Sequence, residues 1–309
     1  MTLHNPDSEG QNACVPSREV IEILPTSLLD LNRLLVNELR DLAGSLGLDF
    51  GWHYLLDLVW IIDMLGSIQG KRIMDAGAGT GVVQWILAGQ GAEVLSVDRV
   101  SRADLPLRYR KRFRVEGLRE QDLIPARRVF VSNFRGSTKL RARLTSQARD
   151  LIGMADLRRT SGQVTIYNQD LKNLASIDDN SMDAVVSVSA LEHNQPEELA
   201  LVVEELLRVL KPGGALLATL GAARDQDWFH EPSFGWCYSE ASLKRIFDLS
   251  QDVPSNFQDY DKLFADLREC AELRENLAKF YFQSGDNGMP WGEWDPQYQS
   301  VGVCKVKAV

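Results

Sequence analysis

Cysteine and histidine are scarce in this chain of 309 residues, which contains four of each. The cysteines are far apart and show neither metal-site spacing nor a disulfide framework, so we expect reduced thiols, no bound metal and a cytoplasmic protein. Long apolar runs are also absent. The longest, at 55–65, is interrupted by Asp57 and Asp63 and is too short to span a bilayer, so no transmembrane segment is predicted. Residues 1–25 are polar and do not resemble a secretory signal.

Basic residues are concentrated in one segment of an acidic chain. Residues 99–163 contain 17 Lys and Arg against 6 Asp and Glu, whereas the whole chain has a net charge of −9. The densest stretch is 108–114. Three interpretations remain open: a solvated helical face, contact with a phosphate-bearing acceptor or an anionic membrane surface, and phosphate contacts with nucleic acid. The acidic remainder of the chain makes nucleic acid the least favoured partner.

A glycine-rich loop follows a short apolar segment at 71–76. Asp75, Gly77, Gly79 and Gly81 form the pattern D-x-G-x-G-x-G, and an apolar helix is expected after it. Glycine lets the backbone approach a ligand closely, because no Cβ intervenes. The third glycine comes one residue too early for a dinucleotide fingerprint, and the acid would repel phosphate. The pattern favours a ligand with a nucleoside and a cationic group.

Further strands follow the loop at regular intervals. Residues 93–97 predict a second strand that ends at Asp98, some twenty residues beyond the loop, where a parallel neighbour would present the acid to ribose hydroxyls. A third strand at 164–167 leads to Asp170. A fourth lies within 181–193, and a helix at 196–210 leads to a strand at 215–220.

Together, the loop, the two acids and the Leu-Glu-His ending at His193 resemble the class I S-adenosylmethionine-dependent methyltransferase family. The resemblance covers roughly residues 71–98 and 163–221. It implies S-adenosyl-L-methionine as cofactor, with S-adenosyl-L-homocysteine as its product, and a contact from Asp170 to the adenine amino group. The cofactor-binding residues that it implies are Asp75, Ala76, Gly77, Gly79, Gly81, Asp98, Arg99, Asp170, Leu171 and Ser189.

The alternation of strands and helices predicts an α/β fold with helices on both faces of the sheet. With the resemblance, we expect a seven-stranded, mostly parallel, doubly wound Rossmann-like sheet whose last strand is antiparallel. The predicted organisation is a polar lead-in at 1–24, a helical cap at 25–70 and a methyltransferase domain at 71–309. That domain includes a basic helical insertion at 99–162 and substrate-side loops at 221–238 and 284–297.

Two histidines follow the fourth and fifth strands, where ligands of open α/β sheets bind. Histidine is the usual general base near neutral pH, so His193 and His230 are the predicted catalytic residues. Purely structural roles remain open for both. Aromatic residues near these positions predict an acceptor pocket formed by Tyr54, Trp228, Glu231 and Trp236.

The sequence therefore predicts methyl transfer to an oxygen of a small-molecule or glycan-type acceptor, phosphate-bearing acceptors included. One alternative is an RNA or DNA methyltransferase that uses the basic insertion. Against it, residues 187–190 lack the Asn/Asp-Pro-Pro-Tyr signature of enzymes that methylate nucleic-acid amino groups. The other alternative is a non-catalytic protein that binds the cofactor and acts through interactions.

Overall fold

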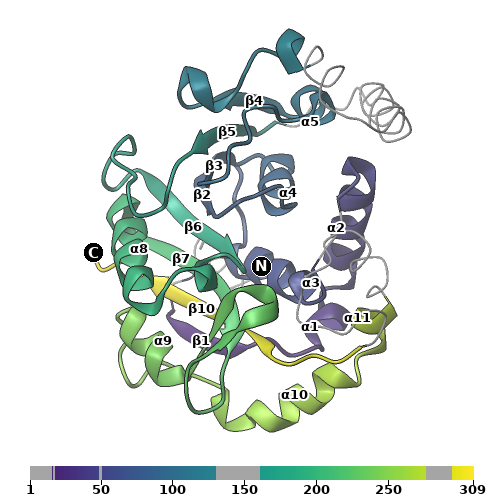
Figure 1. The fold of residues 1–309 in the computed structure, drawn as a ribbon, viewed down its shortest axis with the longest axis vertical. Helices are drawn as coiled ribbons and strands as arrows, with labels where there is room; N and C mark the ends of the chain where they lie inside the picture. Colours follow the sequence, from purple (N-terminus) through teal and green to yellow (C-terminus); the bar gives the residue numbers. More distant parts are fainter. Residues whose placement is uncertain (1–15, 17, 49–50, 130–160, 276–293) are drawn as a thin grey trace, which may run out of the picture.

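A twisted sheet of ten strands forms the centre of the structure, a computed structural model that describes residues 16, 18–48, 51–129, 161–275 and 294–309 (Figure 1). Its main path runs β1-β10-β7-β6-β2-β3-β5-β4, and strands β2 to β7 pair in parallel. These six are Arg72–Ala76 (β2), Glu93–Asp98 (β3), Arg114–Gly117 (β4), Gln163–Asn168 (β5), Met182–Val188 (β6) and Leu210–Ala222 (β7). The predicted α/β sheet is confirmed.

The last strand runs against its neighbours, as predicted. Strand β10 (Gln299–Val306) pairs antiparallel with β7 on one side and with β1 (Val20–Ile23) on the other. β1 lies inside the segment predicted as a polar lead-in, and that prediction is wrong for these four residues. Ile21 and Ile23 are fully buried, so two apolar side chains at alternating positions suffice for an edge strand.

The number of strands was also underestimated. Strands β8 (Trp228–His230) and β9 (Gly235–Tyr238) form a hairpin within the predicted loop 221–238, and β9 pairs with the end of β7. Strand β4 extends the sheet beyond β5, so the insertion at 99–162 is not only helical. Its predicted helix around 140–154 and most of the loop 284–297 lie outside the described residues.

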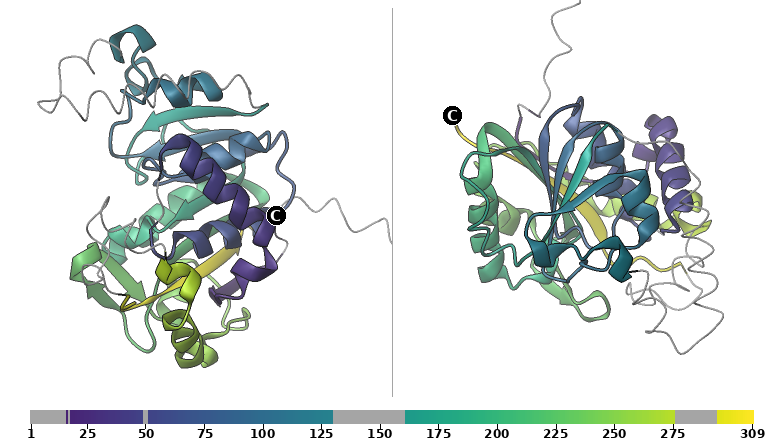
Figure 2. Two further views of the ribbon diagram at one scale, coloured as in Figure 1. Left: turned by 90° about the vertical axis from the view of Figure 1, so that its right-hand side faces the viewer. Right: turned by 90° about the horizontal axis from the view of Figure 1, so that it is seen from above.

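Helices cover both faces of the sheet, as expected for a doubly wound fold (Figures 1 and 2). On one face, α2 (Arg33–Leu46), α3 (Tyr54–Leu65) and α4 (Val83–Gly89) share a buried apolar core. On the other, α8 (Pro196–Val209) and α9 (Glu240–Ile246) share a second one. The remaining α-helices are α1 (Leu28–Leu31), α5 (Leu107–Arg112), α10 (Tyr260–Arg268) and α11 (Ala271–Glu275). No helix in the described ranges is long and apolar enough to cross a membrane.

The predicted helical cap consists of α1, α2 and α3. Val36, Leu39, Ala43 and Leu46 lie at helical spacing and bury one face of α2. The helix ends at Gly47, whose φ of 65° is the left-handed conformation common at helix C-termini. Nearly every residue of α3 is buried, because α3 lies between α1, α2 and the sheet. The N-terminus of α3 thereby reaches the carboxyl ends of the central strands.

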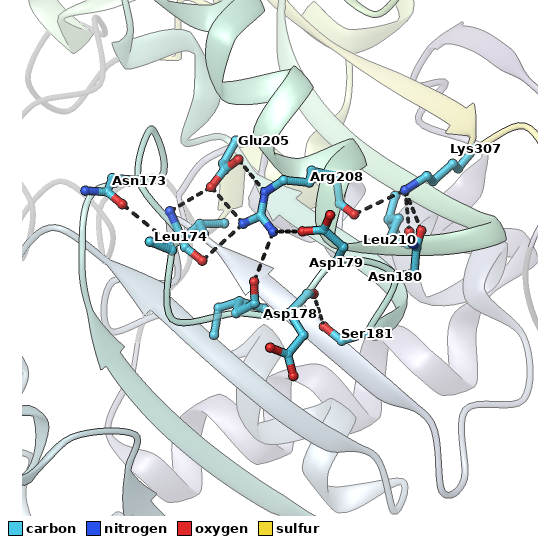
Figure 3. A network of polar contacts seen from close by, with 12 residues as sticks. Asn173, Leu174, Asp178, Asp179, Asn180, Ser181, Glu205, Arg208, Leu210 and Lys307 are labelled. Carbon is cyan, nitrogen blue, oxygen red and sulfur yellow. Dashed lines mark hydrogen bonds and ion pairs between the residues drawn. The ribbon is translucent and has the colours of Figure 1, made fainter.

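The connection from β5 to β6 is held in place by a network around Arg208 at the end of α8 (Figure 3). The Arg208 guanidinium donates to the carbonyl oxygens of Leu174 at 3.1 Å and Ile177 at 3.0 Å, and to Glu205 Oε2 at 2.7 Å. The hydrogen bond from Arg208 is the main cause that lowers the pKa of Glu205. Asp170 is the second residue of this connection, so the network supports the segment that carries this predicted cofactor residue.

Part of the basic stretch 108–114 has a structural role. The Arg110 guanidinium is half-buried and donates to the carbonyl oxygens of Leu105 at 2.9 Å and Ala103 at 3.0 Å. Arg108 donates to the Leu46 carbonyl at 2.9 Å, which ties α5 to the end of α2. Arg108 therefore holds the insertion on the domain and Arg110 braces it internally, so this stretch is not a uniformly solvated basic face.

Candidate functional site

The glycine loop between β2 and α4 is folded around the carboxylate of Asp98. Gly79 N donates to Asp98 Oδ2 at 2.8 Å, and Val100 N donates to Oδ1 at 2.7 Å. Gly77 and Gly79 have φ values of 78° and 46°, which favour glycine. A Cβ on Gly77 would lie 2.4 Å from the Cβ of Ala190. The glycines thus allow the loop to turn tightly against the end of β6.

Arg102 lies beneath this loop and is only 5% exposed. Its guanidinium donates to the Ser96 carbonyl at 2.8 Å and, at 3.4 Å, to those of Gly79 and Tyr167. Sequence reasoning counted Arg102 only as part of the basic segment, and nothing in the sequence pattern distinguishes it from the exposed arginines nearby.

Asp75, at the end of β2, is almost fully buried. Burial raises its pKa to about 7, the positive charge of Arg102 opposes that shift, and the negative charge of Asp98 adds to it. Ala76 is also buried. Neither residue lines either of the two cavities described below. The structure thus places both of these predicted cofactor residues under the loop.

A cavity of about 270 Å³ opens at the carboxyl ends of the central parallel strands, and we call it the strand-end cavity. Carboxylates from β3 and from the segment after β5 line it. Six of the ten predicted cofactor residues do so, whereas Gly79 and Gly81 shape the loop beside it. The lining residues are Gly77, Asp98, Arg99, Val100, Asp170, Leu171, Ser189, Ala190, His193 and Asn194.

A second cavity of about 110 Å³ adjoins the first, and we call it the aromatic cavity. It is assembled from the start of α3, the segment after β6, the β8–β9 hairpin and the residue before β10. Ser189 and His193 line both cavities. The residues around it are His53, Tyr54, Ser189, Glu192, His193, Gly221, Ser233, Gly235, Trp236, Cys237 and Tyr298.

Ser189 occupies the junction in a strained conformation, with φ of 45°. Its backbone N–H donates to the Thr219 carbonyl at 3.1 Å and approaches the Thr219 hydroxyl at 3.2 Å. Its hydroxyl donates to the Glu192 carboxylate. The fixed backbone presents the Ser189 side chain to both cavities.

His193 is oriented by the β8–β9 hairpin. Its Nδ1 lies 2.9 Å from the carbonyl oxygen of Phe234. A carbonyl only accepts, so Nδ1 carries a proton and, in the neutral ring, Nε2 is an acceptor. Nε2 has no hydrogen-bond partner in the described part of the chain. This tautomer is the one that a general base requires.

His230 has a different environment and is 2% exposed. Its Nδ1 lies 2.7 Å from Ser233 Oγ, its Nε2 lies 3.0 Å from Gln297 Oε1, and it lines neither cavity. With both ring nitrogens engaged, this geometry argues against His230 as a base. The β8–β9 hairpin turns the ring inward, and it leaves Trp228 and Glu231 exposed and away from both cavities.

Glu192 and His53 line the aromatic cavity although neither was among the predicted site residues. Glu192 is 7% exposed, and burial raises its pKa, opposed first by the charge of His193. His53 Nδ1 lies 2.7 Å from the buried Asp57, and Tyr298 OH lies 3.3 Å from His53 Nε2. In the sequence, only its position beside His193 could have indicated that Glu192 belongs to the site. His53 and Tyr298 are 245 positions apart and meet only through packing.

Comparison with known proteins supports the methyltransferase resemblance that the motifs after the strands indicate. Residues 139–218 match the family model described as a methyltransferase domain. A ubiquinone biosynthesis O-methyltransferase of Bordetella avium (strain 197N) is 38% identical over 48 residues, which is 16% of this chain. The match spans only 20% of that relative's length. The family match includes β5, β6 and α8 and confirms the resemblance seen in the sequence.

Solved structures that align with most of this chain share little sequence with it. The [4+2]-cyclase SpnF is 17% identical, with a TM-score of 0.45, and the alignment covers 94% of this chain and 100% of that one. A phosphoethanolamine N-methyltransferase 2 of Haemonchus contortus, in complex with S-adenosyl-L-methionine, is 12% identical with a TM-score of 0.44. That alignment covers 92% of this chain and 60% of the other.

Proposed function

We propose that this chain is a class I S-adenosylmethionine-dependent methyltransferase that transfers a methyl group to an oxygen of a small-molecule or glycan-type acceptor. The strand-end cavity would hold the cofactor and the aromatic cavity the acceptor. The observation that carries the proposal is the junction of the two cavities, where Ser189 and His193 line both.

The residues of the strand-end cavity fit the cofactor. Asp98 ends β3 beside the glycine loop, where its carboxylate would accept from ribose hydroxyls, and Asp170 lines the same cavity and would accept from the adenine amino group. Each carboxylate oxygen has two acceptor sites, so the bond from Gly79 N leaves Asp98 Oδ2 able to accept another. When bound, the cofactor supplies an electrophilic methyl group.

The protein contributes alignment and removal of a proton. Alignment of acceptor, carbon and sulfur is worth about 7–11 kcal/mol when the attack geometry is held. His193 lines both cavities, and its Nε2, the acceptor nitrogen of the neutral ring, would take the proton of the acceptor hydroxyl. The name of the curated relative, an O-methyltransferase, supports oxygen as the acceptor atom.

The aromatic cavity favours a small acceptor over nucleic acid. It is narrow, and no Lys or Arg is among the described residues that line it. Arg108 and Arg110 of the basic stretch already bind carbonyl groups of the protein. The phosphate-bearing acceptor and the nucleic-acid alternative therefore gain no support from this cavity.

The cofactor part of the proposal is tested by calorimetry with Asp98→Ala. We expect S-adenosylmethionine and S-adenosylhomocysteine to bind about 10- to 150-fold more weakly, because a charged hydrogen-bond partner is worth about 1.5–3 kcal/mol. Asp104→Ala is the matched control, since Asp104 is an exposed acid six positions further along the chain. Unchanged affinity in Asp98→Ala, or tight NAD binding by the wild type, would refute the cofactor assignment.

A further inference from the structure

Glu192 is a buried acid that belongs to no internal ion pair with Lys or Arg among the described residues. One carboxylate oxygen accepts from the Ser189 hydroxyl, and Oε2 has no hydrogen-bond partner in the described ranges. A Cβ built on Gly235 would lie 3.1 Å from Glu192 Cγ. The hairpin thus packs against the Glu192 side chain and keeps it directed into the aromatic cavity.

The charge of Glu192 is not neutralised by the protein. No Lys or Arg lines this cavity among the described residues, and His193 and His53 oppose the raised pKa of Glu192 only when their rings carry a proton. Removing an ionised carboxylate from water is costly unless a counter-charge and hydrogen bonds replace the solvent. A ligand that brings a positive, hydrogen-donating group would supply both.

The walls of the cavity also suit a cation. The aromatic rings of Tyr54, Trp236 and Tyr298 line it together with Glu192. The negative faces of such rings attract ammonium groups, most strongly where water is excluded. An anionic ligand would meet Glu192 with like charge, and a neutral polyol would leave the carboxylate without a counter-charge.

We propose that the acceptor is a small amino alcohol, an amino sugar included, whose ammonium group binds Glu192 while its hydroxyl faces His193. This rests on the proposed function, because that function places the reacting hydroxyl at the junction. In the transfer, the sulfur–carbon bond breaks with its electron pair left on sulfur, and a carbon–oxygen bond forms. The hydroxyl proton passes to His193 Nε2, and the ammonium group is unchanged.

The cofactor's own sulfonium and α-ammonium groups are the other cations that could face Glu192, and each source gives a different result. A carboxylate facing the α-ammonium would make Glu192→Gln weaken S-adenosylmethionine and S-adenosylhomocysteine alike. If Glu192 binds the acceptor's ammonium, Glu192→Gln leaves the affinities for S-adenosylmethionine and S-adenosylhomocysteine equally unchanged. A carboxylate facing the sulfonium would instead make Glu192→Gln weaken the binding of S-adenosylmethionine and leave that of S-adenosylhomocysteine, whose sulfur is uncharged, as it is.

The test uses two probes of the same shape, trans-2-aminocyclohexanol and trans-cyclohexane-1,2-diol. Their binding to protein saturated with S-adenosylhomocysteine is measured by calorimetry. We expect the wild type to prefer the amino alcohol at least tenfold and Glu192→Gln to lose this preference. Glu197→Gln removes the same charge from an exposed position of α8 and should retain it. Glu192→Asp, which keeps the charge, should retain part of it and serves if Glu192→Gln is poorly folded.

Equal affinity of the wild type for the two probes would overturn the proposal, as would a preference that persists in Glu192→Gln. Selective weakening of S-adenosylmethionine in Glu192→Gln, with no preference between the probes, would assign the carboxylate to the sulfonium instead. Failure of the proposed function has a separate signature, because the wild type would then not bind S-adenosylhomocysteine. In that case the preference between the two probes is measured on protein without S-adenosylhomocysteine.

Discussion

The two adjoining cavities are built in different ways. Residues that directly follow β2, β3, β5 and β6 line the strand-end cavity, all between positions 77 and 194. The aromatic cavity combines segments from His53 to Tyr298. Parallel strands bring their carboxyl ends to one edge of the sheet, so position along the chain determines what meets in the first cavity. The second depends on how a helix, a hairpin and the last strand pack.

The largest effect that distinguishes the two cavities is expected from the histidines. His193→Ala should lower the rate of methyl transfer about 10²–10⁴-fold, the usual contribution of a general base, with a smaller change in S-adenosylhomocysteine affinity. His230→Ala should instead lower the thermal unfolding midpoint, because it removes contacts to Ser233 and Gln297. The measurement is S-adenosylhomocysteine formation with an acceptor that the wild type methylates.

His230→Ala is also the control for His193→Ala, because both remove an imidazole near the hairpin. If folded His230→Ala loses as much turnover as His193→Ala, the aromatic cavity does not contain the base. If both variants keep full turnover, positioning alone accounts for catalysis and the general-base proposal fails.

Sequence reasoning predicted which residues meet where this depends on their position at the end of a strand. Asp98 and Asp170 were predicted as cofactor residues because each acid lies at or just after the end of a strand. The structure brings both to one cavity. His193 and His230 looked equivalent by the same rule. They differ because β9 pairs with the end of β7 and folds the hairpin back, which buries His230 and directs Phe234 O to His193. That pairing involves only two residues of each strand and leaves no clear pattern in the sequence.

The second prediction concerns the support beneath the glycine loop. Arg102→Met should lower the free energy of unfolding by about 3–5 kcal/mol, because it leaves the carbonyls of Ser96, Gly79 and Tyr167 without this donor. It also removes the positive charge between Asp75 and Asp98. Urea denaturation measures the change, and S-adenosylhomocysteine should then bind more weakly.

The control for this variant is Lys111→Met, which removes an exposed positive charge from α5 of the same segment. We expect a change within about 0.5 kcal/mol there, as is usual at the surface. Similar losses in the two variants would contradict the distinction between Arg102 and the exposed part of the basic segment.

The fold itself followed from the alternation of strands and helices, and its additional strands had weak local signals. Strand β1 has four residues, of which only Ile21 and Ile23 point into the core. Strand β4 has the sequence Arg-Val-Glu-Gly and starts at the last residue of the basic stretch. Its charged residues gave no indication that it pairs with β5. Both are short outer strands whose partners, β10 and β5, lie far away in the sequence.

The smallest expected effect concerns the buried acid of the cofactor side. Burial raises the pKa of the Asp75 carboxyl from its ordinary value of 3.8 to about 7. Between these pH values the folded chain binds more protons than the unfolded chain, so the free energy of unfolding falls as pH rises. Asp75→Asn cannot ionise and should lack this part of the fall, which is at most about 1.4 kcal/mol per pH unit.

Urea denaturation of the wild type and Asp75→Asn between pH 4.5 and 8 therefore gives two curves that diverge. The variant should gain on the wild type by about 1–3 kcal/mol toward pH 7, while groups common to both cancel. Its affinity for S-adenosylhomocysteine should change little, because Asp75 does not line the strand-end cavity. Parallel stability curves together with a large loss of affinity would place the Asp75 carboxylate at the ligand, as the sequence predicted. Asp75 would then be a residue that contacts the cofactor and not one that only supports the glycine loop.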